Sequence, residues 1–281
     1  WPFCGAEHYN FDRRWVDGYL INNRPKHESG FDLNKYIWNL KKKYWEKPFQ
    51  IIAPSKWMAQ CVQESALMKN WPCEVIPNCL NTEEWKPLNK SFARKLLNLP
   101  NDKPILAFGT FNSNNQYYKG FDLLKKSLEF LRSKSVSINL VIFGENEPRD
   151  PINYGFPTYY LGILKDSYSL KALYSASDVF LVPSRIESFC QTASEANSCG
   201  TPVVSFNVGG LIDIIKHKET GYLASPFDIK DFANGIIWIL EQNCLSKKLN
   251  KFSRERAVAN WDYSVVSKKY ETLYQKIISN K

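Results

Sequence analysis

The sequence predicts an α/β protein whose core is a parallel β-sheet with helices on both faces. From Lys103 onward, short apolar runs alternate with longer amphipathic stretches, at a spacing that fits one strand followed by one helix. Strand, helix, strand in this rhythm requires right-handed crossovers between parallel strands. The chain has 281 residues, of which 44% are hydrophobic and 23% charged, values that fit one large or two ordinary globular domains.

The first third of the chain is less regular. Residues 1–48 are rich in aromatic and charged residues, and 31–45 is their one convincing helix. Residues 49–53 read as a strand. Ser55 is placed to cap a helix that runs to about residue 69. Residues 73–78 read as a second short strand, and the polar stretch 82–90 then marks a candidate domain boundary.

The regular part carries five predicted strands, at 104–109, 138–144, 158–162, 178–182 and 202–206. Helices are predicted near 120–133, 167–176, 191–199, 210–217 and 228–243. Open parallel sheets bind ligands beyond the carboxyl ends of their strands. We therefore expect a ligand site near the loops that follow these strands, where Gly109, Gly144 and Gly162 lie.

The stretch E-S-F-C-Q-T-A-S-E places two carboxylates, Glu187 and Glu195, on either side of a junction between a strand and a helix. Glu187 falls on the connecting loop, and Glu195 falls one to two turns into the helix. The free backbone amides of a helix start lie between them, and such amides bind phosphate. This arrangement predicts a ligand with a phosphate in the middle and hydroxyl groups at both ends.

A second feature follows the first predicted strand, where a long polar loop leads to Lys119 and Gly120 at the start of a helix. A lysine there could bind a diphosphate that also faces the helix amides, although a solvated lysine is the default for an isolated K-G pair. The V-G-G of 208–210 is interpreted as a tight turn. Cys190 is interpreted as a small loop residue, because no histidine lies near it in the sequence.

Several signatures are missing from the sequence. It lacks G-x-G-x-x-G after a strand, which argues against a nicotinamide or flavin dehydrogenase. The Walker motif, G-x-S-x-G, H-E-x-x-H and paired C-x-x-C motifs are missing as well. It also lacks D-x-D, the carboxylate pair with which a metal would hold a diphosphate. We therefore expect neither metal nor cofactor, with lysine and helix amides neutralising the ligand's charge.

Charge and cysteine content bear on location and partners. Seven scattered cysteines suggest reduced thiols, hence a cytoplasmic protein, and no apolar run approaches the roughly 18–20 residues that span a bilayer. The net charge of +9 is concentrated in 41–47 and 246–256. Peripheral contact with anionic lipid at the inner face of the membrane is one interpretation, and solvated helix faces are the other. Nucleic acid is not expected, because no groove-reading motif accompanies the charge.

The motifs together resemble the retaining group 1 glycosyltransferases of the GT-B fold, especially those that build bacterial surface polysaccharides. The matching segments span about 230 residues, and the E-x7-E block followed by C-G-T-P-V-V is the most specific of them; they are 53–57, 75–81, 108–124, 140–144, 173–204 and 209–223. The resemblance implies transfer of a hexose from a UDP-sugar or GDP-sugar to a glycan or a lipid-linked acceptor. It also implies two facing Rossmann-like domains.

By the same resemblance, Glu187 hydrogen-bonds the donor hexose near the reacting carbon, and Glu195 holds the ribose hydroxyls. Lys119 contacts the diphosphate and, with Glu187, is the candidate catalytic pair. The remaining residues implied in donor binding are Gly109, Thr110, Phe189, Cys190, Gln191, Thr192, Ile163 and Leu164, the last two beside the base.

The chain departs from the family pattern in its phosphate-binding residues. Thr110 stands where the family commonly has a second phosphate-binding arginine, and Tyr118 stands where close relatives often have arginine. Arg185 could compensate and is therefore a further donor-binding candidate. An ion pair within the protein is the alternative role for Arg185.

The resemblance also predicts the domain organisation. Residues 1–84 correspond to the end of an amino-terminal, acceptor-side domain, 85–262 to a complete nucleotide-sugar-binding domain, and 263–281 to a helix that crosses back to the first domain. The family carries more than a hundred residues, including a histidine near the sugar, before the W-P-F that opens this chain. We therefore expect a fragment that binds donor but transfers little sugar by itself. The alternatives are a non-catalytic or degenerate nucleotide-sugar-binding module and, more remotely, an epimerase on the same scaffold.

Overall fold

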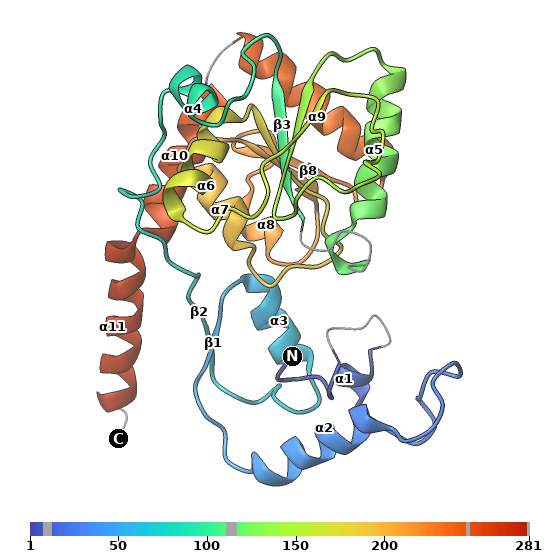
Figure 1. The fold of residues 1–281 in the computed structure, drawn as a ribbon. Coiled ribbons are helices and arrows are strands. Elements are labelled where there is room, and N and C mark those ends of the chain that lie inside the picture. The colour runs from blue at the N-terminus through green and yellow to red at the C-terminus, as the bar shows by residue number, and fades with distance from the viewer. Residues whose placement is uncertain (8–12, 111–116, 246–247, 280–281) are drawn as a thin grey trace. The chain divides into compact units, whose positions relative to one another are not determined.

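The computed structural model describes all residues of the chain except 8–12, 111–116, 246–247 and 280–281 (Figure 1). The described residues form two compact units, Trp1–Ile76 and Pro77–Lys281. The predicted division falls later, at residue 84. Residues 77–84 belong to the second unit, where the Leu80 N–H donates to the Trp261 carbonyl at 2.9 Å and the Thr82 hydroxyl donates to Asp262 at 2.6 Å.

The first unit combines a two-stranded parallel sheet with three helices. Its elements are α1 (Arg14–Asp17), α2 (Leu33–Tyr44), β1 (Ile51–Ala53), α3 (Lys56–Glu64) and β2 (Cys73–Val75). The predicted helix 55–69 ends early, at Glu64, because Ser65 is extended and its hydroxyl accepts the Met68 N–H at 2.9 Å. An aromatic core holds the unit together; its buried members are Phe3, Cys4, Trp15, Tyr19, Trp38, Cys61, Val62 and Met68.

The second unit is built on a six-stranded parallel sheet, which confirms the predicted fold class. The strand order is β5-β4-β3-β6-β7-β8. The strands are β3 (Ile105–Gly109), β4 (Asn139–Phe143), β5 (Thr158–Tyr160), β6 (Val179–Val182), β7 (Val203–Phe206) and β8 (Gly221–Ala224). The five predicted strands are all present, and β8 is an additional one.

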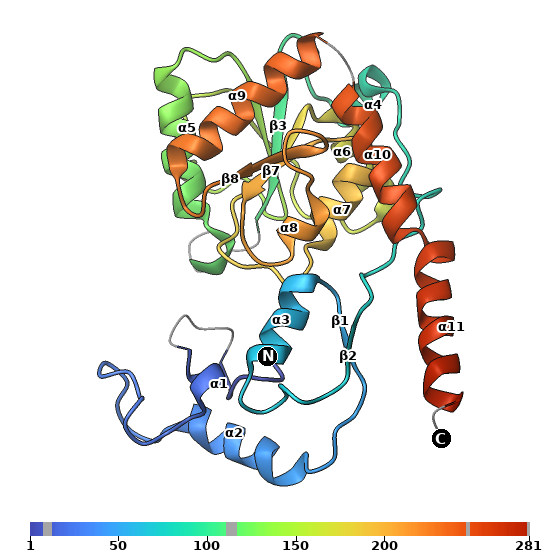
Figure 2. The ribbon, with the colours of Figure 1, turned by 180° about the vertical axis from the view of Figure 1, so that it is seen from behind.

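Helices cover both faces of this sheet. They are α4 (Lys90–Leu96), the 3₁₀ turn η1 (Tyr117–Lys119), α5 (Phe121–Ser133), α6 (Ser167–Ala176), α7 (Gln191–Ser198), α8 (Leu211–Ile214), α9 (Ile229–Leu245), α10 (Lys248–Trp261) and α11 (Tyr263–Ser279). Figures 1 and 2 show α5 and α9 on one side of the sheet and α6, α7 and α10 on the other. The predicted helix 210–217 is shorter than expected, because the chain is already extended at Ile215.

The central strands of this sheet are largely apolar because both of their faces are buried. In β3, Ile105 and Ala107 pack into the core beneath α4, α6, α7 and α10, whereas Leu106 and Phe108 pack into the core beneath α5 and α9. Alternate side chains of a strand point to opposite faces, so a strand with helices on both sides needs an unbroken apolar run. This two-sided core fixes the strands, and with them the loops at their carboxyl ends.

Candidate active site

The candidate site lies at the carboxyl ends of β3 and β6, where the strand order changes direction. The chain goes from β3 outward to β4 and β5, then returns to β6 on the other side of β3. Such a switch point leaves a crevice in which α/β proteins bind ligands. A cavity of about 290 Å³ occupies it, and its lining includes five residues predicted from the sequence, namely Gly109, Thr110, Lys119, Glu187 and Thr192.

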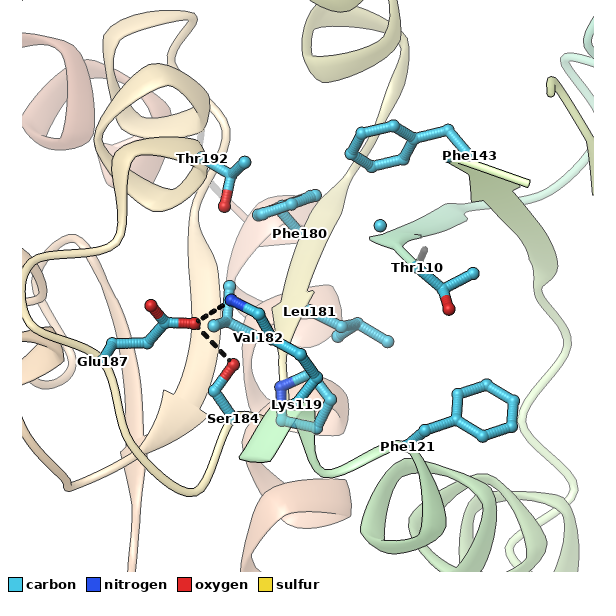
Figure 3. A pocket seen from close by; sticks show the side chains of 13 residues that line it. Thr110, Lys119, Phe121, Phe143, Phe180, Leu181, Val182, Ser184, Glu187 and Thr192 are labelled. Atoms are coloured by element: carbon cyan, nitrogen blue, oxygen red, sulfur yellow. Dashed lines mark hydrogen bonds and ion pairs between the residues drawn. The ribbon is translucent and has the colours of Figure 1, made fainter. Parts of the chain in front are cut away.

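Two charged side chains meet in this cavity (Figure 3). Lys119 Nζ lies 2.7 Å from Glu187 Oε1, and the Ser184 hydroxyl donates to the same oxygen at 2.8 Å. The Lys119 side chain is 57% exposed, whereas that of Glu187 is 14% exposed. Burial lowers the pKa of Lys119, but the adjacent Glu187 carboxylate outweighs it and the pKa is raised. The ammonium group is therefore charged and accessible to an anionic ligand.

Gly120 explains how Lys119 reaches this position. Gly120 adopts φ +67°, and a Cβ on it would collide with the Pro183 carbonyl oxygen of the loop that follows β6. Only glycine tolerates both the left-handed backbone and the close approach. The start of α5 therefore contacts the loop that carries Ser184 and Glu187, and the K-G pair has a structural reason beyond a solvated lysine.

Arg185 is engaged within the protein. Its guanidinium donates to both carboxylate oxygens of Asp122, each at 2.7 Å, and lies 4.0 Å from the centre of the Tyr117 ring. This hydrogen bonding lowers the pKa of Asp122 and raises that of Arg185. The observed geometry matches the ion-pair alternative for Arg185.

The start of α7 lies between the two carboxylates, as the sequence predicts. Phe189 is buried and forms a T-shaped pair with the Trp261 ring, and Cys190 then adopts φ +80° before the helix begins at Gln191. No described side chain caps this helix start. Burial raises the pKa of Cys190 to about 12, so its thiol stays protonated near neutral pH. A ligand at this helix start would therefore contact the backbone N–H groups rather than the Cys190 sulfur.

Glu195 occupies a different environment, one turn into α7. The Tyr174 hydroxyl, fully buried on α6, donates to Glu195 Oε2 at 3.0 Å. Burial raises the pKa of Glu195 to about 7, although the Tyr174 hydrogen bond opposes the rise. Glu195 is outside the residues that line the cavity around Lys119.

The last two predicted residues follow β5. Ile163 is exposed, whereas Leu164 packs against the core, and both lie outside the cavity lining. Part of the long polar loop after β3, residues 111–116, falls outside the described residues.

Sequence reasoning missed three side chains that hold the predicted ones in place. Ser184 contacts Glu187, Asp122 binds Arg185, and Tyr174 binds Glu195. Asp122 and Ser184 are polar residues in the loops and helix starts that follow strands, a signal that could have identified them. The contact of Tyr174 crosses between two helices, α6 and α7, so no local pattern indicates it.

The described part of the chain bears on metals and membranes as well. It contains no group of three or more His, Cys, Asp or Glu side chains placed to hold a metal ion. Among the same residues, every helix is too short or too polar to cross a membrane.

Comparison with known proteins adds several relationships. The chain is 25% identical to a Campylobacter jejuni N,N'-diacetylbacillosaminyl-diphospho-undecaprenol alpha-1,3-N-acetylgalactosaminyltransferase over 266 residues, which are 90% of this chain and 68% of that protein. The sucrose-phosphate synthase of Thermosynechococcus elongatus superposes with a TM-score of 0.73 at 26% identity, over 89% of this chain and 63% of the synthase. Anabaena HepE in complex with UDP-glucose gives a TM-score of 0.67 at 19% identity, over 84% and 67%, which shows a shared fold.

The chain spans about half the length of other curated relatives that it matches. The family described as "Glycosyl transferases group 1" matches residues 89–256, which is more than half of the chain and includes all of the site residues described above. The chain therefore belongs to the group 1 glycosyltransferases.

Proposed function

We propose that the protein transfers a hexose from a nucleoside-diphosphate sugar to a glycan or a lipid-linked acceptor, with retention of configuration and without a metal ion. One observation carries the proposal: an accessible ammonium group, a carboxylate and a helix start converge at the switch-point cavity. HepE binds UDP-glucose and the Campylobacter relative is named for transfer to a diphospho-undecaprenol acceptor, which supports a UDP-sugar donor and a lipid-linked acceptor here.

The proposed donor lies across the start of α7. Its diphosphate binds Lys119 and the backbone amides from Phe189 to Thr192, since a helix start and a cation both stabilise phosphate. Its hexose binds Glu187 and its ribose hydroxyls bind Glu195, while the base lies near Ile163 and Leu164. When the diphosphate takes Lys119, Glu187 is released from its present partner and can accept a sugar hydroxyl.

The chemistry follows from this placement. The bond between the anomeric carbon and the phosphate oxygen breaks, a bond to the acceptor oxygen forms, and the acceptor's proton passes to the departing diphosphate. Negative charge grows on that diphosphate in the transition state. In this proposal Lys119 and the α7 amides stabilise that charge, and hydrogen-bond donors placed in this way are usually the largest single contribution to such catalysis.

The proposed location is cytoplasmic, with peripheral contact at an anionic membrane where a lipid-linked acceptor would reside. In the basic segment 41–47, Lys41 is occupied by the carbonyls of Trp1, Cys4 and Gly5, at 2.7–3.2 Å. Lys42 and Lys43 are exposed on α2. These two lysines are the ones that we assign to lipid headgroups.

Calorimetry with UDP and with UDP-glucose tests the donor assignment. Glu195→Ala should lower the affinity for both UDP and UDP-glucose by about ten- to a hundredfold, because both ligands contain the ribose. Glu187→Ala should weaken mainly UDP-glucose. Glu241→Ala, an exposed acid on α9, is the matched control and should change neither. Equal losses for both ligands in both site variants would contradict the assignment.

A product assay separates transfer from the alternatives. Glycosylated product that forms only when acceptor is present supports a transferase. Binding without any product would favour a nucleotide-sugar-binding module, and an epimerised donor formed without acceptor would identify an epimerase.

A further inference from the structure

An ion pair joins the two segments that carry the charged residues of the cavity. Asp122 lies three residues after Lys119 at the start of α5, and Arg185 lies two residues before Glu187 in the loop after β6. Both guanidinium–carboxylate hydrogen bonds are 2.7 Å long. A bidentate pair of this kind fixes orientation as well as distance.

The backbone reinforces the same connection. The Arg185 N–H donates to the Tyr118 carbonyl at 2.8 Å, and Arg185 Nη1 donates to the Tyr117 carbonyl at 2.7 Å. The two carbonyls immediately before Lys119 are thus both held by one residue of the Glu187 loop. The guanidinium also lies over the Tyr117 ring, and this cation–π contact adds to the hydrogen bonds between Arg185 and η1.

The same contacts leave Arg185 poorly placed to bind a diphosphate. The residue is 8% exposed, and it lies outside the residues that line the cavity. Its Nη1 and Nη2 atoms both serve Asp122. The donors that Asp122 and Tyr117 leave over belong to a side chain that is nearly buried, and the pair with Asp122 already neutralises the charge that would attract a phosphate.

We propose that Arg185 and Asp122 are positioning residues, which set the place of Lys119 relative to Glu187 and do not contact the donor. This inference rests on the proposed donor site. Asp122 thereby has a role as the partner of Arg185. Lys119, rather than Arg185, is then the side chain that binds the diphosphate.

Asp122→Asn distinguishes the two roles of Arg185 by the sign of its effect. If Arg185 positions Lys119, loss of the charged pair should weaken UDP binding, by about tenfold. If Arg185 is a latent phosphate ligand, freeing it from Asp122 should strengthen UDP binding. Glu129→Gln removes the same charge from an exposed position on the same helix and is the matched control. It should leave the affinity unchanged.

Three further readouts separate positioning from a general loss of structure. Uridine, which has no phosphate, should bind Asp122→Asn as it binds the parent chain, and thermal melting should show a folded protein. Arg185→Lys should be as harmful as Arg185→Met, because lysine keeps the charge but cannot form the fork.

Weaker UDP binding with unchanged uridine binding supports the positioning role, whereas tighter or unchanged UDP binding in Asp122→Asn overturns it. A parent chain that binds neither UDP nor GDP contradicts the proposed function instead. The positioning role is then judged by NMR titration of the Lys119 ammonium group, whose pKa Glu187 raises. That pKa should fall in Asp122→Asn, and an unchanged value would overturn the inference.

Discussion

The loop after β6 and the helix α7 each carry a glutamate of the proposed site, Glu187 and Glu195, but the electrostatic environments of the two carboxylates are opposite. Glu187 accepts from an ammonium group and a hydroxyl, whereas Glu195 accepts from the neutral, fully buried Tyr174. Burial without a cation raises the pKa of Glu195 to about 7. Two carboxylates eight residues apart therefore differ in their partners: Glu187 lies beside an ammonium group, whereas Glu195 is held by a neutral phenol.

The largest expected effect concerns Glu187, because the contrast with Glu195 has no functional meaning if Glu187 can be replaced without loss of transfer. We expect Glu187→Gln to lower the rate of sugar transfer on the order of 10²–10³-fold, because it removes an interaction with the hexose where positive charge develops. Initial rates of transfer with a radiolabelled donor, for the parent chain and for Glu187→Gln, measure this. A loss of less than about fivefold would place the reacting carbon elsewhere.

The setting of Glu195 predicts a pH-dependent stability. Its pKa is about 7 in the folded state and 4.5 for an unburied glutamate, so the folded state binds more protons between these pH values. Stability should therefore fall as pH rises from about 4.5 to 7. Glu195→Gln lacks this titrating group, so its free energy of unfolding should rise relative to that of the parent chain by about 2–3 kcal/mol between these pH values. Urea unfolding at several pH values tests it, and parallel curves for the two proteins would contradict the burial of this charge.

The next prediction concerns Lys119, the cation that is paired with Glu187, whereas Glu195 accepts from a neutral hydroxyl. Lys119→Ala should weaken UDP binding about tenfold at low salt, since it removes a charge-assisted contact. The deficit should shrink as salt screens the exposed ammonium group. Calorimetry at two ionic strengths measures both effects, with Lys126→Ala on the exposed side of α5 as the control. A deficit that is insensitive to salt would mean that Lys119 acts through packing instead.

The smallest expected effect belongs to Tyr174. Its hydrogen bond lowers the pKa of Glu195, so Tyr174→Phe should raise that pKa above about 7. If the Glu195 carboxylate accepts the ribose hydroxyls, UDP affinity increases as that group deprotonates, and the increase should move to higher pH in the variant. We expect a loss of only a fewfold near pH 7. An unchanged pH profile would separate Glu195 from the nucleotide.

Much of the fold could be predicted because the strands of the second unit are buried on both faces. A continuous apolar run such as 104–109, bounded by polar loops, is typical of a strand in the middle of a parallel sheet. The strand β8 escaped prediction because its four residues, G-Y-L-A, begin with glycine and end against a turn. Short elements of this kind depend on tertiary pairing, here with β7, rather than on local preference.

The helix α10 escaped for a different reason. Its buried stripe is Leu249, Ser253, Ala257 and Trp261, spaced four residues apart and half of it small. From the sequence, the segment looks like a basic, solvated surface. Small residues at that spacing indicate a helix packed closely against another, and α10 packs against α7.

The site was only partly accessible from sequence. The E-x7-E spacing and the K-G pair indicate the principal charged residues, because helix starts and strand ends have known uses. The supporting contacts of Asp122 and Tyr174 depend on side chains from elements 63 and 21 residues away from their partners. No local periodicity encodes such contacts.

The glycines around the Glu187 loop have a consequence for anyone who wishes to redesign the donor preference. A Cβ at Gly120 would collide with the Pro183 carbonyl, and Cβ atoms at Gly209 and Gly210 would collide with the carbonyls of Glu187 and Ser188. The loop is confined on both sides by bare backbone. Libraries that randomise these glycines should yield mostly misfolded variants. If the donor binds as proposed above, changes in sugar specificity are best sought among the side chains that line the cavity, such as Thr110 and Thr192.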